Sequence, residues 1–414
     1  MKRTVYQELH QHSWMFNRIG VQHFLPCYTN NNRSIMGYFD YSNSYMCQLK
    51  EEDYKDPFLF LSHVFKDADS AEQIQEECWE IFTLAFKPYL WKAYESPLII
   101  YKKFKQMIRL LELGSLISTI RPTHYAIKGQ MLASFPYRDN NDVHNSLISK
   151  EKIQDTYNTL IESYADDMLR FYRMVLFQIL LAGFDHKGQL NDTCLGEMLF
   201  LRFRAIREIV NCLFIIHLHE KVHRHFHSYV PQYRQTIGHT VERSYTTDHD
   251  IYGIIDGATT IPHMHEQLKV SHKILLESNY WKTHDDPGTV LVRFQYFRNI
   301  IETFYLHFMT ISDADFTIDV DWPIPEKQQK ALNKMAKEVV RNPWRYFEHK
   351  LKEKPLACWL KGVDEWEEAI LSNEASAPSF IQHIDVVKTF LATLIVIADL
   401  MVYEPLYELH DDVF

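Results

Sequence analysis

Glycine is scarce in this chain, with only 12 glycines among 414 residues. The glycine-rich motifs GxxxxGK(S/T) and GxGxxG, whose backbone amides cradle phosphates, do not occur. The GxSxG motif of the serine hydrolases is missing too. The sequence therefore lacks the common signatures of nucleotide-binding enzymes and of α/β-hydrolases.

Paired cysteines and long apolar runs are also missing. The six cysteines are scattered and form no CxxC pair, which argues against a disulfide framework and a thiolate zinc site. The first residues lack the apolar stretch of a signal peptide. The most apolar segment, Val387–Tyr403, is interrupted by Lys388 and Asp399 and is too short to span a bilayer. We therefore expect a cytoplasmic protein without a membrane segment, with this stretch as a core helix.

Positive charge is in deficit, because 54 acidic residues outnumber 44 lysines and arginines, for a net charge of −10. This balance argues against nucleic-acid binding, which needs a basic face. Hydrophobic residues make up 46% of the chain and aromatic residues 14%, enough to build a large core. We expect a folded protein whose partner is a small molecule, while its oligomeric state does not follow from the sequence.

Apolar residues recur at helical spacing along most of the chain. This pattern predicts helices over residues 71–90, 96–120, 150–181, 194–229, 263–280, 290–309 and 326–340. Residues 123–137 alternate instead and predict a small β hairpin. The expected fold is mostly α, with long packed antiparallel helices and a small irregular or β element before residue 150. The expected division is an N-terminal helical region, 1–149, and a main helical domain, 150–414.

Histidine is concentrated in one part of the chain. Eleven of the 22 histidines lie between His217 and His284, and five of them lie in the eleven residues His217–His227. Imidazole is the commonest metal ligand and titrates near neutral pH, so this density suggests a metal site. It is equally compatible with a structural role, in which a border of histidines between core and solvent bonds to carbonyl groups or water.

The segment His219-Glu220-Lys221-Val222-His223 is an HExxH motif. One helical turn places both imidazoles on the same face, where they can bind one Zn²⁺, and the glutamate can then deprotonate a zinc-bound water. Eighteen residues separate His223 from Glu242, beyond the break at Pro231. This arrangement resembles the gluzincin metallopeptidases, in which a second helix supplies a glutamate ligand. The resemblance implies zinc bound by His219, His223 and Glu242, with Glu220 as general base.

Three further segments indicate a different function. They are Ser134-Phe135-Pro136, the run from Tyr229 to Arg234 (YVPQYR), and the aromatic-rich helix from Leu291 to Tyr305. Their order is similar to that in the indoleamine and tryptophan dioxygenase superfamily, including its pyrrolnitrin-pathway branch. That resemblance implies an all-α, haem-dependent oxygenase acting on an aromatic, indole-like molecule.

The haem ligand departs from the family pattern. Arg298 stands where the family carries its iron-ligating histidine, and a guanidinium has no lone pair to offer iron. His307, nine residues further on, is then the expected proximal ligand, and Arg234 the partner of a propionate or a substrate carboxylate. Three hypotheses follow from the sequence: a haem oxygenase, a zinc hydrolase, and a non-catalytic helical interaction protein with structural histidines.

Overall fold

The computed structural model describes residues 48–84, 86, 90–120, 155–165, 168–184, 193–223, 261–311 and 343–403. These residues are almost entirely helical and contain no strand, which confirms the mostly α fold. The expected hairpin at 123–137, the domain boundary at residue 150 and the helix at 326–340 lie outside them. In chain order the longer helices are α5 (Pro57–Val64), α6 (Ala68–Leu84), α7 (Pro97–Ile120), α9 (Thr156–Ser163), α10 (Met168–Phe184), α11 (Thr193–His223), α14 (Ile261–Leu276), α15 (Pro287–Ile311), α18 (Pro343–Glu353), α19 (Leu356–Leu371) and α20 (Pro378–Tyr403).

Proline defines where many of these helices begin. Five of the described helices, α5, α7, α15, α18 and α20, have a proline as their first residue. Proline suits this position because its fixed φ matches the helix and its missing N–H would have no partner there. Aspartate strengthens two of these starts. Asp56 accepts a hydrogen bond from the backbone N–H of Phe58, and Asp286 accepts one from that of Thr289.

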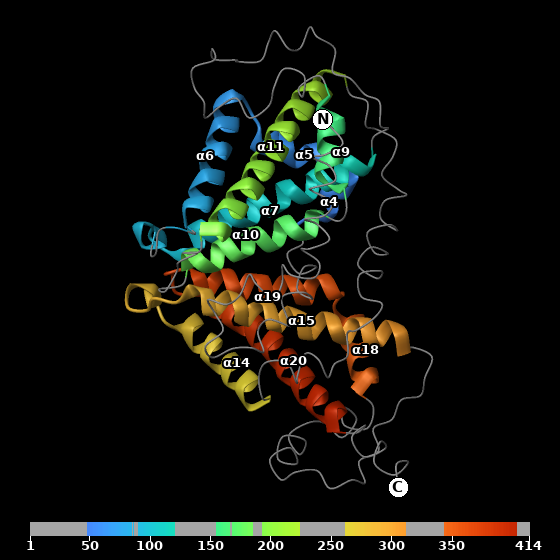
Figure 1. The fold of residues 1–414 in the computed structure, drawn as a ribbon. Coiled ribbons are helices and arrows are strands. Elements are labelled where there is room, and N and C mark those ends of the chain that lie inside the picture. The colour runs from blue at the N-terminus through green and yellow to red at the C-terminus, as the bar shows by residue number, and fades with distance from the viewer. Residues whose placement is uncertain are drawn as a thin grey trace, which may run out of the picture.

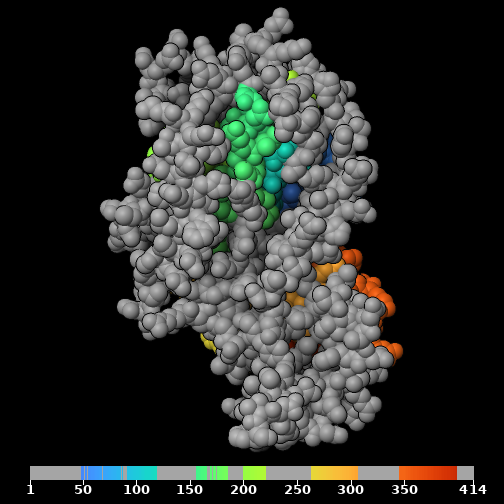
Figure 2. All heavy atoms as spheres, turned by 45° about the vertical axis from the view of Figure 1, so that its right-hand side comes forward, coloured from blue at the N-terminus to red at the C-terminus, as the bar shows by residue number. Residues whose placement is uncertain are grey.

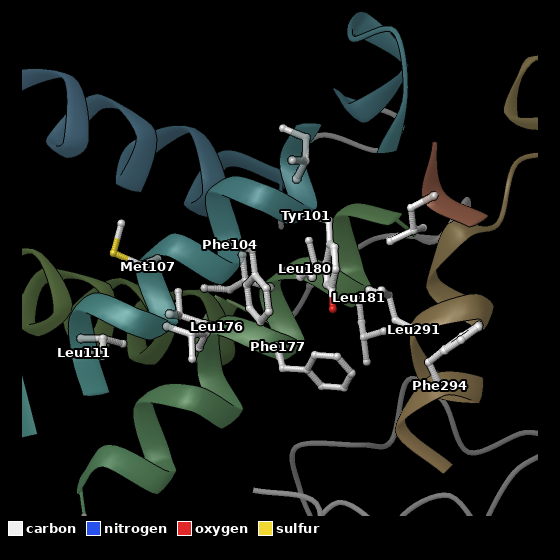
Figure 3. Packing of buried hydrophobic residues seen from close by; sticks show 14 of the residues in the cluster. Tyr101, Phe104, Met107, Leu111, Leu176, Phe177, Leu180, Leu181, Leu291 and Phe294 are labelled. Atoms are coloured by element: carbon white, nitrogen blue, oxygen red, sulfur yellow. The ribbon is translucent and has the colours of Figure 1, made fainter. Parts of the chain in front are cut away.

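The helices form two stacked groups. Helices α5 to α11, with the short α4 (Glu51–Lys55), lie in one group, and α14 to α20 lie in the other (Figure 1). Helix α10 packs against α15, and α7 packs against α19, so the two groups share a contact face. Figure 3 shows aromatic and aliphatic side chains of α7, α10 and α15 meeting there, among them Tyr101, Phe104, Phe177 and Phe294.

Helix α20 belongs to the core of the second group. By length and composition its residues Pro378–Ala398 could cross a membrane. In the structure the helix packs against α14, α15 and α19, and its Phe390 stacks on Trp359 with ring centroids 4.1 Å apart. Gly362 permits the close approach of α19, because a Cβ there would lie 2.7 Å from a methyl carbon of Val387.

The segment 150–181, expected to be one helix, is two. Helix α9 ends at Ser163 and α10 begins at Met168. Tyr164 lies between them and donates its hydroxyl to the carbonyl of Leu111 on α7, 2.6 Å away, with its ring against Gly114. Tyr172 of α10 donates to the carbonyl of Ser163, a group left over at the end of α9. The prediction of a continuous helix was wrong because these contacts come from the tertiary structure.

Candidate functional site

The last turns of α11 carry the HExxH motif. Because successive helical residues are 100° apart, positions 219, 220 and 223 lie within one arc of the helix. Helix α9 packs against α11, and Figure 2 shows α9 and α10 (green) reaching the surface on this side. His219 and Glu220 are only 4% and 5% exposed. The structure therefore places these two side chains inside the protein, and His219 is not a border residue between core and solvent.

Tyr157 of α9 is the polar neighbour of this pair. Its hydroxyl donates to Oε1 of Glu220 at 2.5 Å. The Tyr157 ring meets the imidazole of His219 edge to face, with centroids 6.2 Å apart. Nδ1 of His219 lies 3.6 Å from Oε1 of Glu220. We call Tyr157, His219 and Glu220 the α9–α11 cluster.

His217 belongs to a different environment. It lies two residues before His219 and so points about 200° away around the helix. Its imidazole is buried beside the ring of Phe65, at the end of α5, with centroids 6.4 Å apart. The five clustered histidines of the sequence therefore do not share one face.

The other predicted site residues are only partly placed. His223 is the last residue of α11 and His307 lies in α15, but their side chains are outside the described part of the structure. Arg234 and Glu242 lie outside the described residues altogether. Within the described residues, no group of three or more His, Cys, Asp or Glu side chains is arranged to hold a metal ion. The zinc and haem assignments therefore both remain predictions.

Arg298 has a clear structural role. Its Nε and Nη2 lie 2.7 and 2.6 Å from Oδ1 of Asp364 on α19, and Nη2 also pairs with Glu367. Tyr101 of α7 donates to the same Glu367 carboxylate at 2.6 Å. Burial alone would lower the pKa of Arg298, but the two carboxylates outweigh it and hold that pKa well above its usual range. Arg298 of α15 is thus joined to α19 directly, and the Tyr101 hydroxyl connects the same carboxylate to α7.

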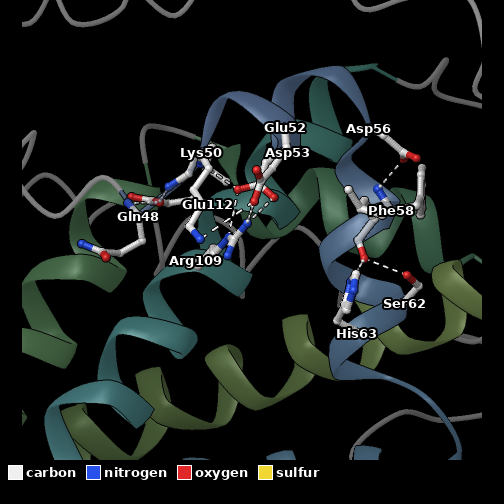
Figure 4. Close-up of polar contacts among 12 residues, drawn as sticks. Gln48, Lys50, Glu52, Asp53, Asp56, Phe58, Ser62, His63, Arg109 and Glu112 are labelled. Carbon is white, nitrogen blue, oxygen red and sulfur yellow. Dashed lines mark hydrogen bonds and ion pairs between the residues drawn. The ribbon is translucent and has the colours of Figure 1, made fainter. Parts of the chain in front are cut away.

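A second buried ionic cluster lies in the first group of helices (Figure 4). Glu112 of α7 accepts hydrogen bonds from the backbone N–H groups of Gln48 and Leu49, at 2.7 and 3.0 Å, and pairs with Arg173 of α10. One turn away, Arg109 binds both carboxylate oxygens of Asp53, at 2.7 and 2.9 Å. These contacts attach Gln48, Leu49 and α4 to α7.

Sequence reasoning missed Tyr157 and the carboxylates of Arg298. Tyr157 precedes Leu160 and Ile161 of the predicted apolar stripe by three and four residues, so it shares their buried face. A buried tyrosine needs a partner for its hydroxyl, so a hydrogen bond from Tyr157 to a polar group of a neighbouring helix could have been expected. No comparable signal links Arg298 to Glu367, because 69 positions separate them.

The Tyr157–Glu220 hydrogen bond can be tested directly. Tyr157→Phe keeps the ring and removes the donor, so we expect the free energy of unfolding to fall by about 1.5–3 kcal/mol, as for hydrogen bonds to charged groups. Tyr172→Phe is the matched control. It removes a bond to a neutral carbonyl and should cost only about 0.5–1.5 kcal/mol. Urea denaturation measures both, and equal losses would contradict a charged, buried Glu220.

Comparisons with known proteins do not assign this site. The chain matches no known protein family, no curated protein by sequence, and no solved structure.

Proposed function

We propose that the end of α11 is the centre of a metal-dependent hydrolase, with His219 and His223 as zinc ligands and Glu220 as general base. Glu242 is the proposed third protein ligand. Zinc held by these residues would supply a bound water of lowered pKa, and Glu220 would lie beside it as the base.

One observation carries the proposal: Glu220 is buried beside His219 and is held by Tyr157. Burying a carboxylate is costly unless other groups compensate for its lost hydration, and Tyr157 contributes to that compensation. A cation bound beside Glu220 would contribute further, since a positive charge favours the ionised form of a neighbouring carboxylate. The hydroxyl of Tyr157 fixes Oε1 of Glu220 and so orients the proposed base, as outer groups commonly do around metal sites.

The test of the proposal is the metal content of the purified protein. Elemental analysis after purification without chelators should find about one zinc per chain. His223→Ala should lose it, while Glu220→Gln should retain it and lower the rate of zinc-dependent hydrolysis by about 10²–10⁴-fold. His263→Ala is the control, because His263 is an exposed histidine on α14. Thermal melts of each variant separate loss of metal from loss of fold.

An absorption spectrum separates the zinc and haem hypotheses. Protein produced with haem supplied should show no Soret band under the zinc proposal, whereas the haem hypothesis requires one that His307→Ala removes. A chain that binds neither group, before or after dialysis against zinc, would overturn the proposal and leave the histidines a structural role.

A further inference from the structure

Helices α6 and α11 run side by side (Figure 1), and aromatic side chains of both helices meet along their junction. Phe82 stacks on Phe203 with ring centroids 4.4 Å apart, and it also contacts Trp79, Phe86 and Phe200 at 5.0–6.0 Å. We call these five residues the aromatic seam. Four of them belong to α6 and α11, which are more than a hundred residues apart in the sequence, and Phe86 lies two positions after the end of α6.

The outer part of the seam is open to solvent. Trp79, Phe86 and Phe200 are 45%, 45% and 47% exposed, whereas Phe82 and Phe203 beneath them are buried. Single exposed apolar residues are ordinary, but a contiguous aromatic patch marks a surface that another molecule covers. Aromatic residues are also enriched at the centres of protein–protein interfaces.

The exposed charges beside the outer rings of the seam are of opposite sign on the two helices. Helix α6 contains five acidic residues and no lysine or arginine, and its Glu72 and Glu76 are exposed within two turns of Trp79. On α11, Arg204 is exposed one turn from Phe200. Within the described part of the chain, none of these three charges has an ion-pair partner.

We propose that the aromatic seam is the interface of a symmetric homodimer, in which α6 of one protomer lies over α11 of the other. A two-fold axis parallel to the seam exchanges the two helices, so the acidic side meets the basic side and the aromatic rings meet each other. An axis across the seam would instead stack α6 on α6 and bring acids together, which is unfavourable. The charges therefore select a second copy of this chain in one orientation.

The antiparallel course of the two helices sets the contacts. Trp79 meets Phe203, with ring centroids 6.0 Å apart, and Gln75 bonds to Asn211, so residue numbers rise along α6 as they fall along α11. Glu76 and Arg204 consequently lie at similar heights along the seam. In the dimer each Glu76 can reach Arg204 of the other protomer, which forms the pair twice.

Sedimentation velocity over a wide range of concentration tests the dimer. The unaltered protein should dimerise, and Phe200→Ser should raise the dissociation constant by about tenfold or more while the monomer stays folded. Arg204→Glu and Glu76→Arg should each raise the dissociation constant as well. The double variant, which exchanges the two charges, should restore most of the lost affinity because the pair is re-formed with reversed sign.

Leu276→Ser is the matched control, since Leu276 is an exposed apolar residue of α14, in the other group of helices. It should leave the dissociation constant unchanged. A protein that stays monomeric at every concentration overturns the proposal and points to a different partner for the seam. A dimer that withstands Phe200→Ser, or a charge exchange that restores nothing, overturns the proposed interface.

Discussion

Arg298→Met is expected to lower the free energy of unfolding by about 3–5 kcal/mol, because it leaves a buried carboxylate without its cation. Glu367 is almost fully buried, and once the guanidinium is gone the Tyr101 hydroxyl is its one remaining hydrogen-bond donor among the residues that the structure describes. The contact also joins α15, α19 and α7, so its loss weakens the junction between the two groups of helices. Urea denaturation measures the change.

The double variant Arg298→Met/Glu367→Leu is the sharper experiment. If the penalty comes from an unpaired charge, removing both partners should recover most of the stability, since apolar pairs of similar volume often replace buried ion pairs without loss. Lys361→Met is the control on α19, the helix that carries Glu367. It breaks an exposed pair with Glu365 and should change the free energy of unfolding by about 0.5 kcal/mol or less.

The effect of pH on Arg298→Met has a definite sign. Burial raises the pKa of Glu367 above its ordinary value, and Arg298 opposes this rise. Without Arg298 the folded protein binds this proton still more tightly than the unfolded chain does. Stability is then gained as the pH falls through the raised pKa and is lost as the pH rises through it. The defect of the variant should therefore be smaller at about pH 5 than near neutrality, and an equal defect at both would contradict an ionised Glu367.

Glu112→Ala, in the other group of helices, is expected to lower the free energy of unfolding by a similar amount, about 3–5 kcal/mol. The change removes the partner of Arg173 and the acceptor for the backbone N–H groups of Gln48 and Leu49. Hydrogen exchange should report faster exchange at these two amides, and denaturation the global loss. Glu112→Gln keeps one acceptor oxygen and the shape of the side chain, so it should cost less.

Glu52→Ala is the matched control for Glu112→Ala. Glu52 lies in α4, close in sequence to the backbone amides that Glu112 binds, but its carboxylate is exposed and its contacts with Lys50 and Arg109 are long, at 3.9 and 3.4 Å. Exposed pairs of this kind contribute about 0–1 kcal/mol. If both variants lose the same stability, the buried position of Glu112 is not what makes it important.

The helices were largely predictable because their determinants are local. The spacing of apolar residues predicted α7 over residues 96–120, and the structure has it at Pro97–Ile120. It also predicted the helices now seen as α14 and α15. The prediction of one continuous helix over residues 150–181 failed because of a tertiary contact. Tyr164 reaches a carbonyl and a glycine of α7, more than 40 residues earlier in the chain.

The candidate site was predictable only in part. The HExxH spacing identified His219 and Glu220, because helical geometry alone brings them to one side of α11. Nothing local indicated that both would be buried, since charged side chains are seldom found inside unless they are paired. Their burial depends on the packing of α9, which contributes Tyr157 from 63 positions away.

The sequence by itself determined most of the helical segments and their apolar faces, because 3.6-residue periodicity and proline act over a few residues. Tertiary structure alone decided the partners of the buried charges: Arg298 with Glu367, Glu112 with Arg173, and Glu220 with Tyr157. The physical reason is that a buried charge must be satisfied by whichever group the packing brings within about 3 Å, and helix packing places residues there without regard to their separation along the chain.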